Sequence, residues 1–91
     1  MNEAEIENAV VAYAESLGAI AVKLRVDGEN GFPDRTIIGP AGVLFIEFKT
    51  PRGRLRPMQR VWIERLTSQG HQVEVVSSVA RGCEIVDRFL G

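Results

Sequence analysis

Residues 34–49 read DRTIIGPAGVLFIEFK, a pattern that predicts a β-hairpin with charged residues at its open end. The two strand segments, Arg35–Ile38 and Val43–Ile46, are rich in β-branched and aromatic residues, which favour strands. Between them, Gly39–Gly42 contains the glycines and proline that are typical of a tight turn. The simplest hairpin therefore has Pro40 and Ala41 as its two central turn residues.

The position of this turn determines which charged residues face each other. With a two-residue turn, Asp34 lies directly opposite Glu47, and their Cβ atoms are expected about 4.5–5.5 Å apart on one face. Lys49 follows Glu47 by two residues and therefore points to the same face. A turn one residue longer would instead place the two carboxylates on opposite faces.

Two opposed carboxylates predict a bound cation, because like charges disfavour joint ionisation. Oxygen ligands suit a hard divalent ion, Mg²⁺ or Mn²⁺, which lowers the pKa of a bound water. Lys49 beside it would position that water or stabilise charge in the transition state. Alternatively, the three charged residues could lie on a solvent-exposed face of the sheet and have no function. The apolar run Val43–Ile46 argues against this, because it predicts a strand buried on both faces, where charges are uncommon unless they are paired or bind a metal. Asp34, Glu47 and Lys49 are thus candidate catalytic residues for phosphodiester hydrolysis.

A basic segment follows the lysine, although the whole chain has a net charge of −1. No acidic residue interrupts it, whereas the first seventeen residues carry glutamates and no Lys or Arg. Cations beside a carboxylate site are suited to contacts with DNA phosphates. The candidate DNA-binding residues of this segment are Arg52, Arg54, Arg56 and Arg60.

Several of these motifs together resemble the VRR-NUC family of the PD-(D/E)XK nuclease superfamily. The resemblance extends from about Glu5 to about Val76, and its small stand-alone members occur in phages and bacteria. The matching segments are Gly31–Asp34, Glu47–Lys49 and Gly53–Gln59, with Gly18, Lys23–Val26, Trp62, Leu66 and Gly70–His71 in addition.

The resemblance implies further roles at the site. A glutamate eleven residues before the glycine that ends the first helix completes the metal site in such nucleases, which points to Glu7, with Glu3 as the alternative. The backbone carbonyl of Phe48 would be a further metal ligand. Gln59 would orient the substrate or the lysine, and Lys23 would contact a phosphate.

The expected fold class is α/β: an αβββαβ core of the PD-(D/E)XK type, with a mixed four-stranded sheet flanked by helices, and an extra C-terminal helix. Apolar spacing, caps and turn residues predict these elements. Asn2 is expected to cap the first helix and Ser77 or Ser78 the last. In chain order, we expect a helix over Glu3–Leu17, a strand over Ala19–Val26, the hairpin, a helix over Pro57–Gln69, a strand over Gln72–Val76 and a helix through Phe89 and Leu90.

Length and composition predict a single domain over residues 1–91. The only cysteine, Cys83, excludes an internal disulfide and is expected to be a small core residue. No stretch reaches the roughly 18 apolar residues of a membrane span, and the N-terminus lacks a signal-peptide pattern. We therefore expect a cytoplasmic protein that binds no membrane and no small-molecule cofactor.

The predicted function is a metal-dependent, structure-selective DNA endonuclease that resembles Holliday-junction resolvases. The family resemblance implies a homodimer, and two symmetric metal sites would suit paired nicks on a four-way junction. The last helix, Val10, Val11 and Trp62 are candidate interface residues. Two alternatives remain: a nickase or flap-type nuclease, and a non-catalytic DNA-binding accessory protein.

Overall fold

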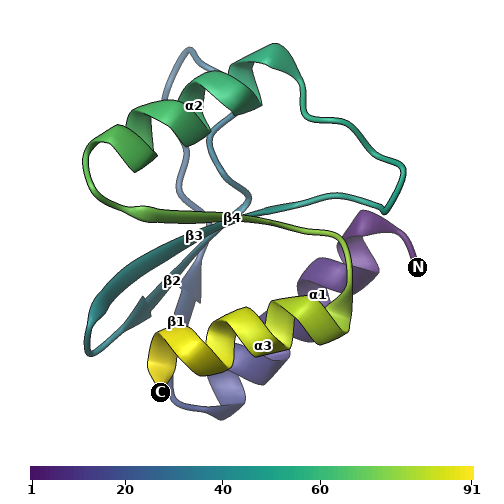
Figure 1. Cartoon of the computed structure of the whole chain (residues 1–91), viewed down its shortest axis with the longest axis vertical. Helices are drawn as coiled ribbons and strands as arrows, with labels where there is room; N and C mark the ends of the chain where they lie inside the picture. The colour runs from purple at the N-terminus through teal and green to yellow at the C-terminus, as the bar shows by residue number, and fades with distance from the viewer.

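A four-stranded mixed sheet lies at the centre of the computed structural model, which describes all 91 residues (Figure 1). Helices cover both faces of the sheet, and the predicted order αβββαβα is confirmed. Along the chain the elements are α1 (Glu3–Ser16), β1 (Ile20–Val22), β2 (Arg35–Gly39), β3 (Gly42–Phe48), α2 (Pro57–Ser68), β4 (Gln72–Val76) and α3 (Val79–Leu90).

The sheet has the strand order β1-β2-β3-β4 and the register that the hairpin sequence predicts. β1, β2 and β3 are antiparallel neighbours, and β4 runs parallel to β3 after the crossover through α2. Arg35 pairs with Ile46 and Gly39 pairs with Gly42, which leaves Pro40 and Ala41 as the two turn residues. This register fixes which residues of the two strands share a face.

The hydrophobic core lies between the sheet and the helices α1 and α3, which cover one face together (Figure 1). Leu44, Ile46 and Phe48 of β3 are fully buried on this face. They pack with Val10 of α1 and Val86 of α3, which are also fully buried. Because side chains alternate along a strand, the odd-numbered residues of β3 point to the opposite face, toward α2.

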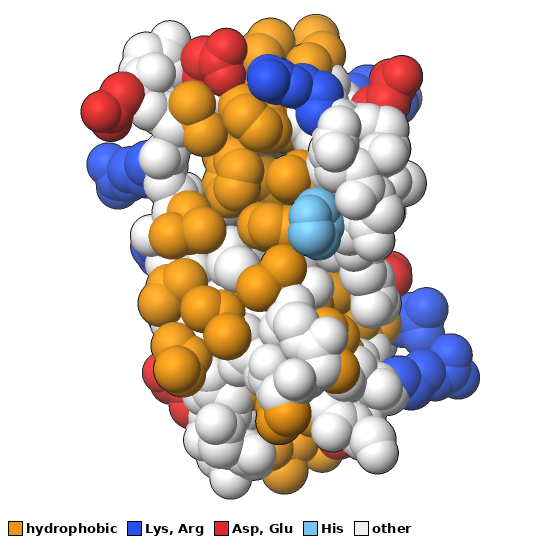
Figure 2. All heavy atoms as spheres, turned by 90° about the vertical axis from the view of Figure 1, so that its left-hand side faces the viewer, with side chains coloured by type: hydrophobic (Ala, Val, Ile, Leu, Met, Phe, Trp, Pro, Cys, Tyr) orange, Lys and Arg blue, Asp and Glu red, His pale blue; other side chains and the backbone are white.

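The face toward α2 is only partly covered. Gln59 is the only buried residue of α2, and the apolar side chains of Met58 and Val61 on this helix are exposed. On the same face of the sheet, Ile20 and Ile38 pair across β1 and β2, and 58% of Ile20 is exposed. Figure 2, which faces the left-hand side of Figure 1, shows hydrophobic side chains as a band that runs from top to bottom, with the single histidine beside them.

Two sequence expectations differ from the structure. The first strand was expected to reach Val26, but its pairing ends where Val22 pairs with Thr36. Continuation in this register would bring Pro33 into the ladder, and proline has no N–H to donate. Val10 and Val11, proposed as interface residues, are instead buried, because α1 packs its apolar side on the sheet.

The helix caps follow the sequence closely. The Asn2 side chain accepts a hydrogen bond from the Glu5 N–H, and the Glu5 carboxylate accepts one from the Asn2 N–H, which forms a capping box. Ser78, rather than Ser77, caps α3. Cys83 of α3 is half-buried. None of the helices has the length and apolar character needed to cross a bilayer.

Gly31 allows the loop before β2 to approach the first turn of α2. Its φ is +99°, and a Cβ atom at this position would lie 2.6 Å from the Met58 carbonyl carbon. We expect Gly31→Ala to destabilise the protein by about 2–4 kcal/mol, the combined cost of a left-handed conformation and a backbone clash. Gly28→Ala is the matched control, because its φ is +78° but nothing lies within 4 Å. Urea unfolding should show the larger loss for Gly31→Ala, and equal losses would contradict the close approach.

Candidate active site

Asp34 and Glu47 face each other on the α2 side of the sheet. Asp34 directly precedes β2 and Glu47 follows Ile46 in β3, so the hairpin register brings them opposite each other. A hydrogen bond also fixes the Asp34 side chain, because its Oδ2 accepts from the Phe48 N–H at 2.8 Å. The sequence prediction of two adjacent carboxylates at this place is therefore met by the geometry.

Glu47 is buried, with only 2% of its surface exposed, and two side chains approach one of its oxygens. Gln59 of α2 donates a hydrogen bond of 2.9 Å from Nε2 to Glu47 Oε2. The Lys49 Nζ lies 3.9 Å from the same oxygen. The structure thus brings together Asp34, Glu47, Lys49 and Gln59.

Gln59 connects this site to the start of α2. Its Oε1 accepts a hydrogen bond of 2.8 Å from the Arg56 N–H, one of the backbone donors that a helix leaves unsatisfied at its N-terminus. The same buried side chain therefore orients the Glu47 carboxylate and closes the first turn of α2. Gln59 lies two residues after Pro57, the first residue of α2, and this position in the sequence indicates a role in capping the helix.

The surroundings of Glu47 favour its neutral form. Burial is the main cause and the adjacent carboxyl group of Asp34 the next, both as a charge and as a hydrogen-bonding partner. Together they raise the pKa of Glu47 to about 8, although Lys49 acts in the opposite direction. In the absence of a cation, the neutral form of the Glu47 carboxyl group is therefore favoured at neutral pH.

Glu7 contacts two cations, whereas the family resemblance implies that it binds a metal ion. Its Oε2 is 2.6 Å from Arg35 Nε and 3.8 Å from Lys23 Nζ. Arg35 points away from the Asp34 face because neighbouring residues of a strand alternate. Glu7 therefore forms an ion pair on the α1 side of the sheet, and its role as a metal ligand stays a prediction. The sequence analysis missed Arg35, whose place on a face covered by α1 requires an acidic partner.

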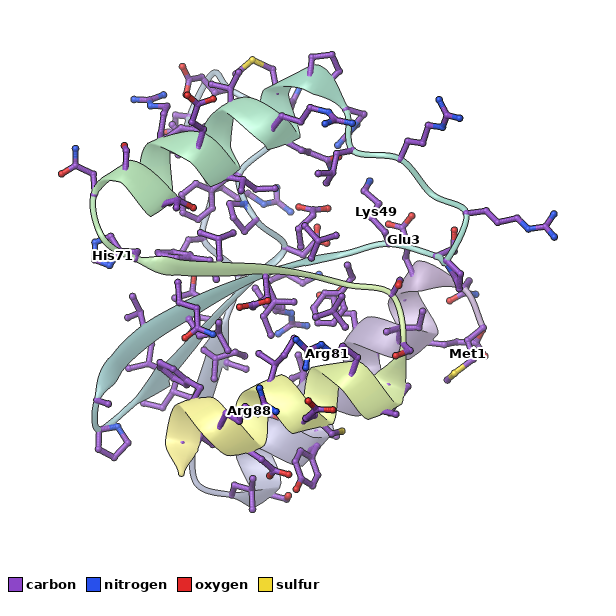
Figure 3. All side chains as sticks on the ribbon, viewed as in Figure 1. Met1, Glu3, Lys49, His71, Arg81 and Arg88 are labelled. Atoms are coloured by element: carbon purple, nitrogen blue, oxygen red, sulfur yellow. The ribbon has the colours of Figure 1, made fainter.

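Glu3 lies one helical turn before Glu7, in the first turn of α1. Its carboxylate adds to the causes that raise the pKa of Glu47, behind burial and Asp34. Figure 3 shows Glu3 and Lys49 at the same end of the sheet. The charge of Glu3 is the smallest of these influences on the pKa of Glu47.

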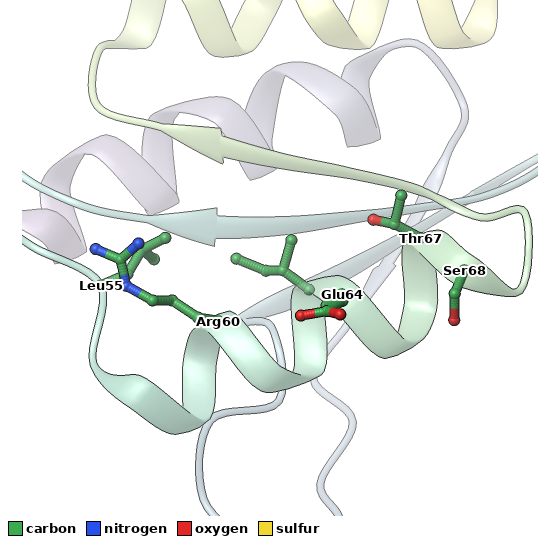
Figure 4. A pocket seen from close by; sticks show the side chains of 6 residues that line it. Leu55, Arg60, Glu64, Thr67 and Ser68 are labelled. Carbon is green, nitrogen blue, oxygen red and sulfur yellow. The ribbon is translucent and has the colours of Figure 1, made fainter.

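The basic segment lies beside this site. Arg52, Arg54 and Arg56 are exposed on the loop that joins β3 to α2. Arg60, in contrast, lies with Glu64 and Ile63 along a groove of about 480 Å³ beside α2 (Figure 4). This groove contains none of the candidate catalytic residues. His71 makes an edge-on contact with Phe45, with ring centroids 6.0 Å apart, and has no contact with the carboxylates.

The side chains present suit a hard divalent ion, although they do not form a complete ligand set. No three His, Cys, Asp or Glu side chains lie close enough together to hold a metal ion. Asp34 and Glu47, however, are two adjacent carboxyl groups whose joint ionisation is unfavourable without a cation. Mg²⁺ typically binds to one or two carboxylates and takes its other oxygens from water and substrate phosphates. The donor set therefore fits Mg²⁺ or Mn²⁺.

The sequence profile of the VRR-NUC domain matches residues 4–80. The chain belongs to the VRR-NUC domain family. A solved structure described as a VRR_NUC domain is similar to it with a TM-score of 0.86 and 28% identity, over 96% of each chain. A second, described as a VRR_NUC domain protein, has a TM-score of 0.81 and 18% identity over 98% of this chain and 88% of its own, which supports the fold alone. A search of curated proteins gave no significant match. Family membership makes the chain a nuclease-type domain.

The raised pKa of Glu47 predicts how stability depends on pH when metal is absent. The folded protein holds this proton up to about pH 8, whereas an ordinary Glu releases it near pH 4.5. Unfolding between these values therefore releases a proton, so the free energy of unfolding falls as pH rises from about 4.5 to about 8.

Thermal unfolding in the presence of a chelator tests this dependence. We expect the Tm of the wild type to fall across that pH range and the slope to be much weaker in Glu47→Gln, which cannot titrate. Glu64→Gln, on the exposed surface of α2, is the control and should keep the slope of the wild type. Parallel curves for all three proteins would show that Glu47 does not carry the effect.

Proposed function

We propose that this domain is a metal-dependent endonuclease that cuts branched DNA, with a four-way junction as its preferred substrate. The observation that supports this most directly is the pair of the half-buried Asp34 and the buried Glu47, with Lys49 Nζ 3.9 Å and Gln59 Nε2 2.9 Å from the same Glu47 oxygen. A cation, a neutral donor and two carboxyl groups on one face are the parts needed for phosphodiester hydrolysis.

The roles of the side chains follow from their positions. Asp34, Glu47 and the carbonyl of Phe48 would hold Mg²⁺ or Mn²⁺, which supplies an activated water and neutralises charge on the scissile phosphate. Lys49, only 9% exposed, places its ammonium group where negative charge grows on the phosphate. Gln59 holds Glu47 in one orientation, and the arginines at 52, 54 and 56 contact flanking phosphates.

For the third acidic residue we favour Glu3 over Glu7. Glu7 is already paired with Arg35 and Lys23, whereas Glu3 takes part in no ion pair or side-chain hydrogen bond of the structure. Glu7 then has a structural role, in which it neutralises an arginine that is only 17% exposed.

The preference for a four-way junction rests on a proposed homodimer. A two-fold dimer presents two identical sites to a substrate that is itself nearly two-fold symmetric. The exposed Ile20 and Ile38, which pair across β1 and β2, belong to the surface on which we place the second copy. A monomer would instead be suited to single nicks or to flap cleavage.

The central experiment is cleavage of end-labelled DNA in the presence and absence of Mg²⁺ or Mn²⁺, combined with sedimentation at micromolar concentration. We expect a dimer that makes paired, metal-dependent nicks near the branch of a four-way junction and cuts linear duplex poorly. Cleavage restricted to flaps or single strands by a monomer would refute the resolvase assignment. Binding to DNA without cleavage in either metal would favour a non-catalytic accessory protein.

Lys49→Ala should separate binding from catalysis. We expect it to bind the junction with near-normal affinity and to lose about 10²–10³-fold in cleavage rate, because one preorganised charge is removed from the transition state. Arg88→Gln, an exposed cation on α3, is the control and should retain the rate of the wild type. A Lys49→Ala variant that is folded and cleaves normally would contradict the catalytic role of Lys49.

Glu3→Gln and Glu7→Gln test the choice of the third acidic residue. We expect Glu3→Gln to raise the Mg²⁺ concentration needed for half-maximal cleavage while leaving Tm almost unchanged. Glu7→Gln should mainly lower Tm, by removing the charge that pairs with Arg35, at a cost of about 1–3 kcal/mol. The reverse result, with the metal requirement altered only in Glu7→Gln, would assign the metal site to Glu7.

A further inference from the structure

A cleft opens beside Asp34, where the chain leaves the sheet after β1. Its first part has a volume of about 200 Å³ and its second part about 350 Å³, and the two parts share Leu24, Arg25 and Phe32. The first part is lined in addition by Glu7, Lys23, Pro33 and Asp34, and the second by Val26 and residues 27–31. We refer to the whole as the Leu24–Phe32 cleft.

The cleft exists because β1 is short. Beyond the pair of Val22 and Thr36, the segment that follows β1 and the segment that precedes β2 separate instead of continuing the ladder. Phe32 forms a fixed wall, because its ring makes edge-on contacts with Phe45 at 5.7 Å and with Trp62 at 5.1 Å. The early end of β1 thus leaves a cleft that is bounded by Phe32 and begins at Asp34, a candidate catalytic residue.

The end of the cleft near Asp34 is lined by two cations, Lys23 and Arg25, together with the carboxyl groups of Glu7 and Asp34. Lys23 is exposed, and its only ion pair is the 3.8 Å contact with Glu7. Arg25 is also exposed and takes part in none of the salt bridges or side-chain hydrogen bonds of the structure. Two cations with few protein partners beside the proposed cleavage site are suited to a phosphate group.

The rest of the cleft has a different chemistry. Leu24, 48% exposed, and Phe32 supply apolar surface in the shared middle part. The far end is lined by Asp27, Glu29 and Asn30, whose side-chain oxygens accept hydrogen bonds. The Glu29 carboxylate lies 3.9 Å from Arg65 Nη1, and the unpaired charge of Asp27 would repel a second phosphate. A phosphate end, an apolar middle and an acceptor-rich end together match one nucleotide, with its base directed away from the backbone.

We propose that the Leu24–Phe32 cleft binds one unpaired nucleotide of the DNA strand next to the scissile phosphate, with its phosphate on Lys23 and Arg25 and its base against Leu24 and Phe32. The amino group of an adenine, cytosine or guanine would donate to the acceptors at the far end. This inference rests on the proposed nuclease function and adds a reason for selectivity. A base at a branch point enters such a cleft at low cost, whereas a base in duplex must first be unstacked and unpaired.

Binding measurements test this proposal without requiring cleavage. Fluorescence anisotropy in EDTA would compare a fully paired duplex with the same duplex carrying a short single-stranded flap, each with the wild type, Arg25→Gln and Leu24→Ser. Both changes are at exposed positions and should leave the fold intact, which far-UV circular dichroism checks. Arg88→Gln, on the exposed surface of α3, is the control for loss of a positive charge (Figure 3).

We expect both variants to lose about tenfold in affinity for the flap substrate and less than about twofold for the duplex, because each change removes a contact that only the unpaired nucleotide makes. The control should alter neither affinity. Equal losses of affinity for the flap and the duplex would show that Arg25 is a general phosphate contact, which would overturn the proposal. Unchanged affinities would overturn it as well. Since cleavage is scored separately, selective binding by a protein that never cuts would reject only the nuclease function. Normal cutting without selective binding would reject only the cleft.

Discussion

The register of β2 against β3 is the constraint on which both the core and the site depend. It places Leu44, Ile46 and Phe48 toward α1 and α3, and the alternate residues Glu47 and Lys49 toward α2. A shift by one residue would exchange the two sets, which would expose the core side chains and bury the carboxylate among valines and isoleucines. Folding and site assembly are therefore specified by the same pairing, and neither can be changed without the other.

Features that depend on neighbouring residues could be predicted from the sequence. The turn at Pro40 and Ala41 sets the register, so the meeting of Asp34 and Glu47 follows from local chemistry alone. The ends of α1 and α2 lie within one residue of the prediction, because Asn2 caps α1 and Pro57 begins α2. For such features the information needed is contained in a few consecutive side chains.

Features that depend on how elements dock could not be derived in this way. Helical spacing places Glu3 and Glu7 on one side of α1, but it does not say how far along the sheet the helix lies. Only the packed structure shows that Glu7 reaches Arg35, while the charge of Glu3 acts on Glu47. The exposure of Met58 likewise reflects the limited contact of α2 with the sheet, which the apolar pattern of the helix itself does not reveal.

The contacts of Glu47 also explain how the basic loop is held near the site. Lys49 precedes this loop and Gln59 follows it, and both approach the same Glu47 oxygen. Gln59 in addition accepts a hydrogen bond from the Arg56 N–H at the end of the loop. The loop is therefore held at both of its ends by contacts to one carboxylate. A single buried glutamate thus links the proposed metal site, the start of α2 and the proposed phosphate-binding surface.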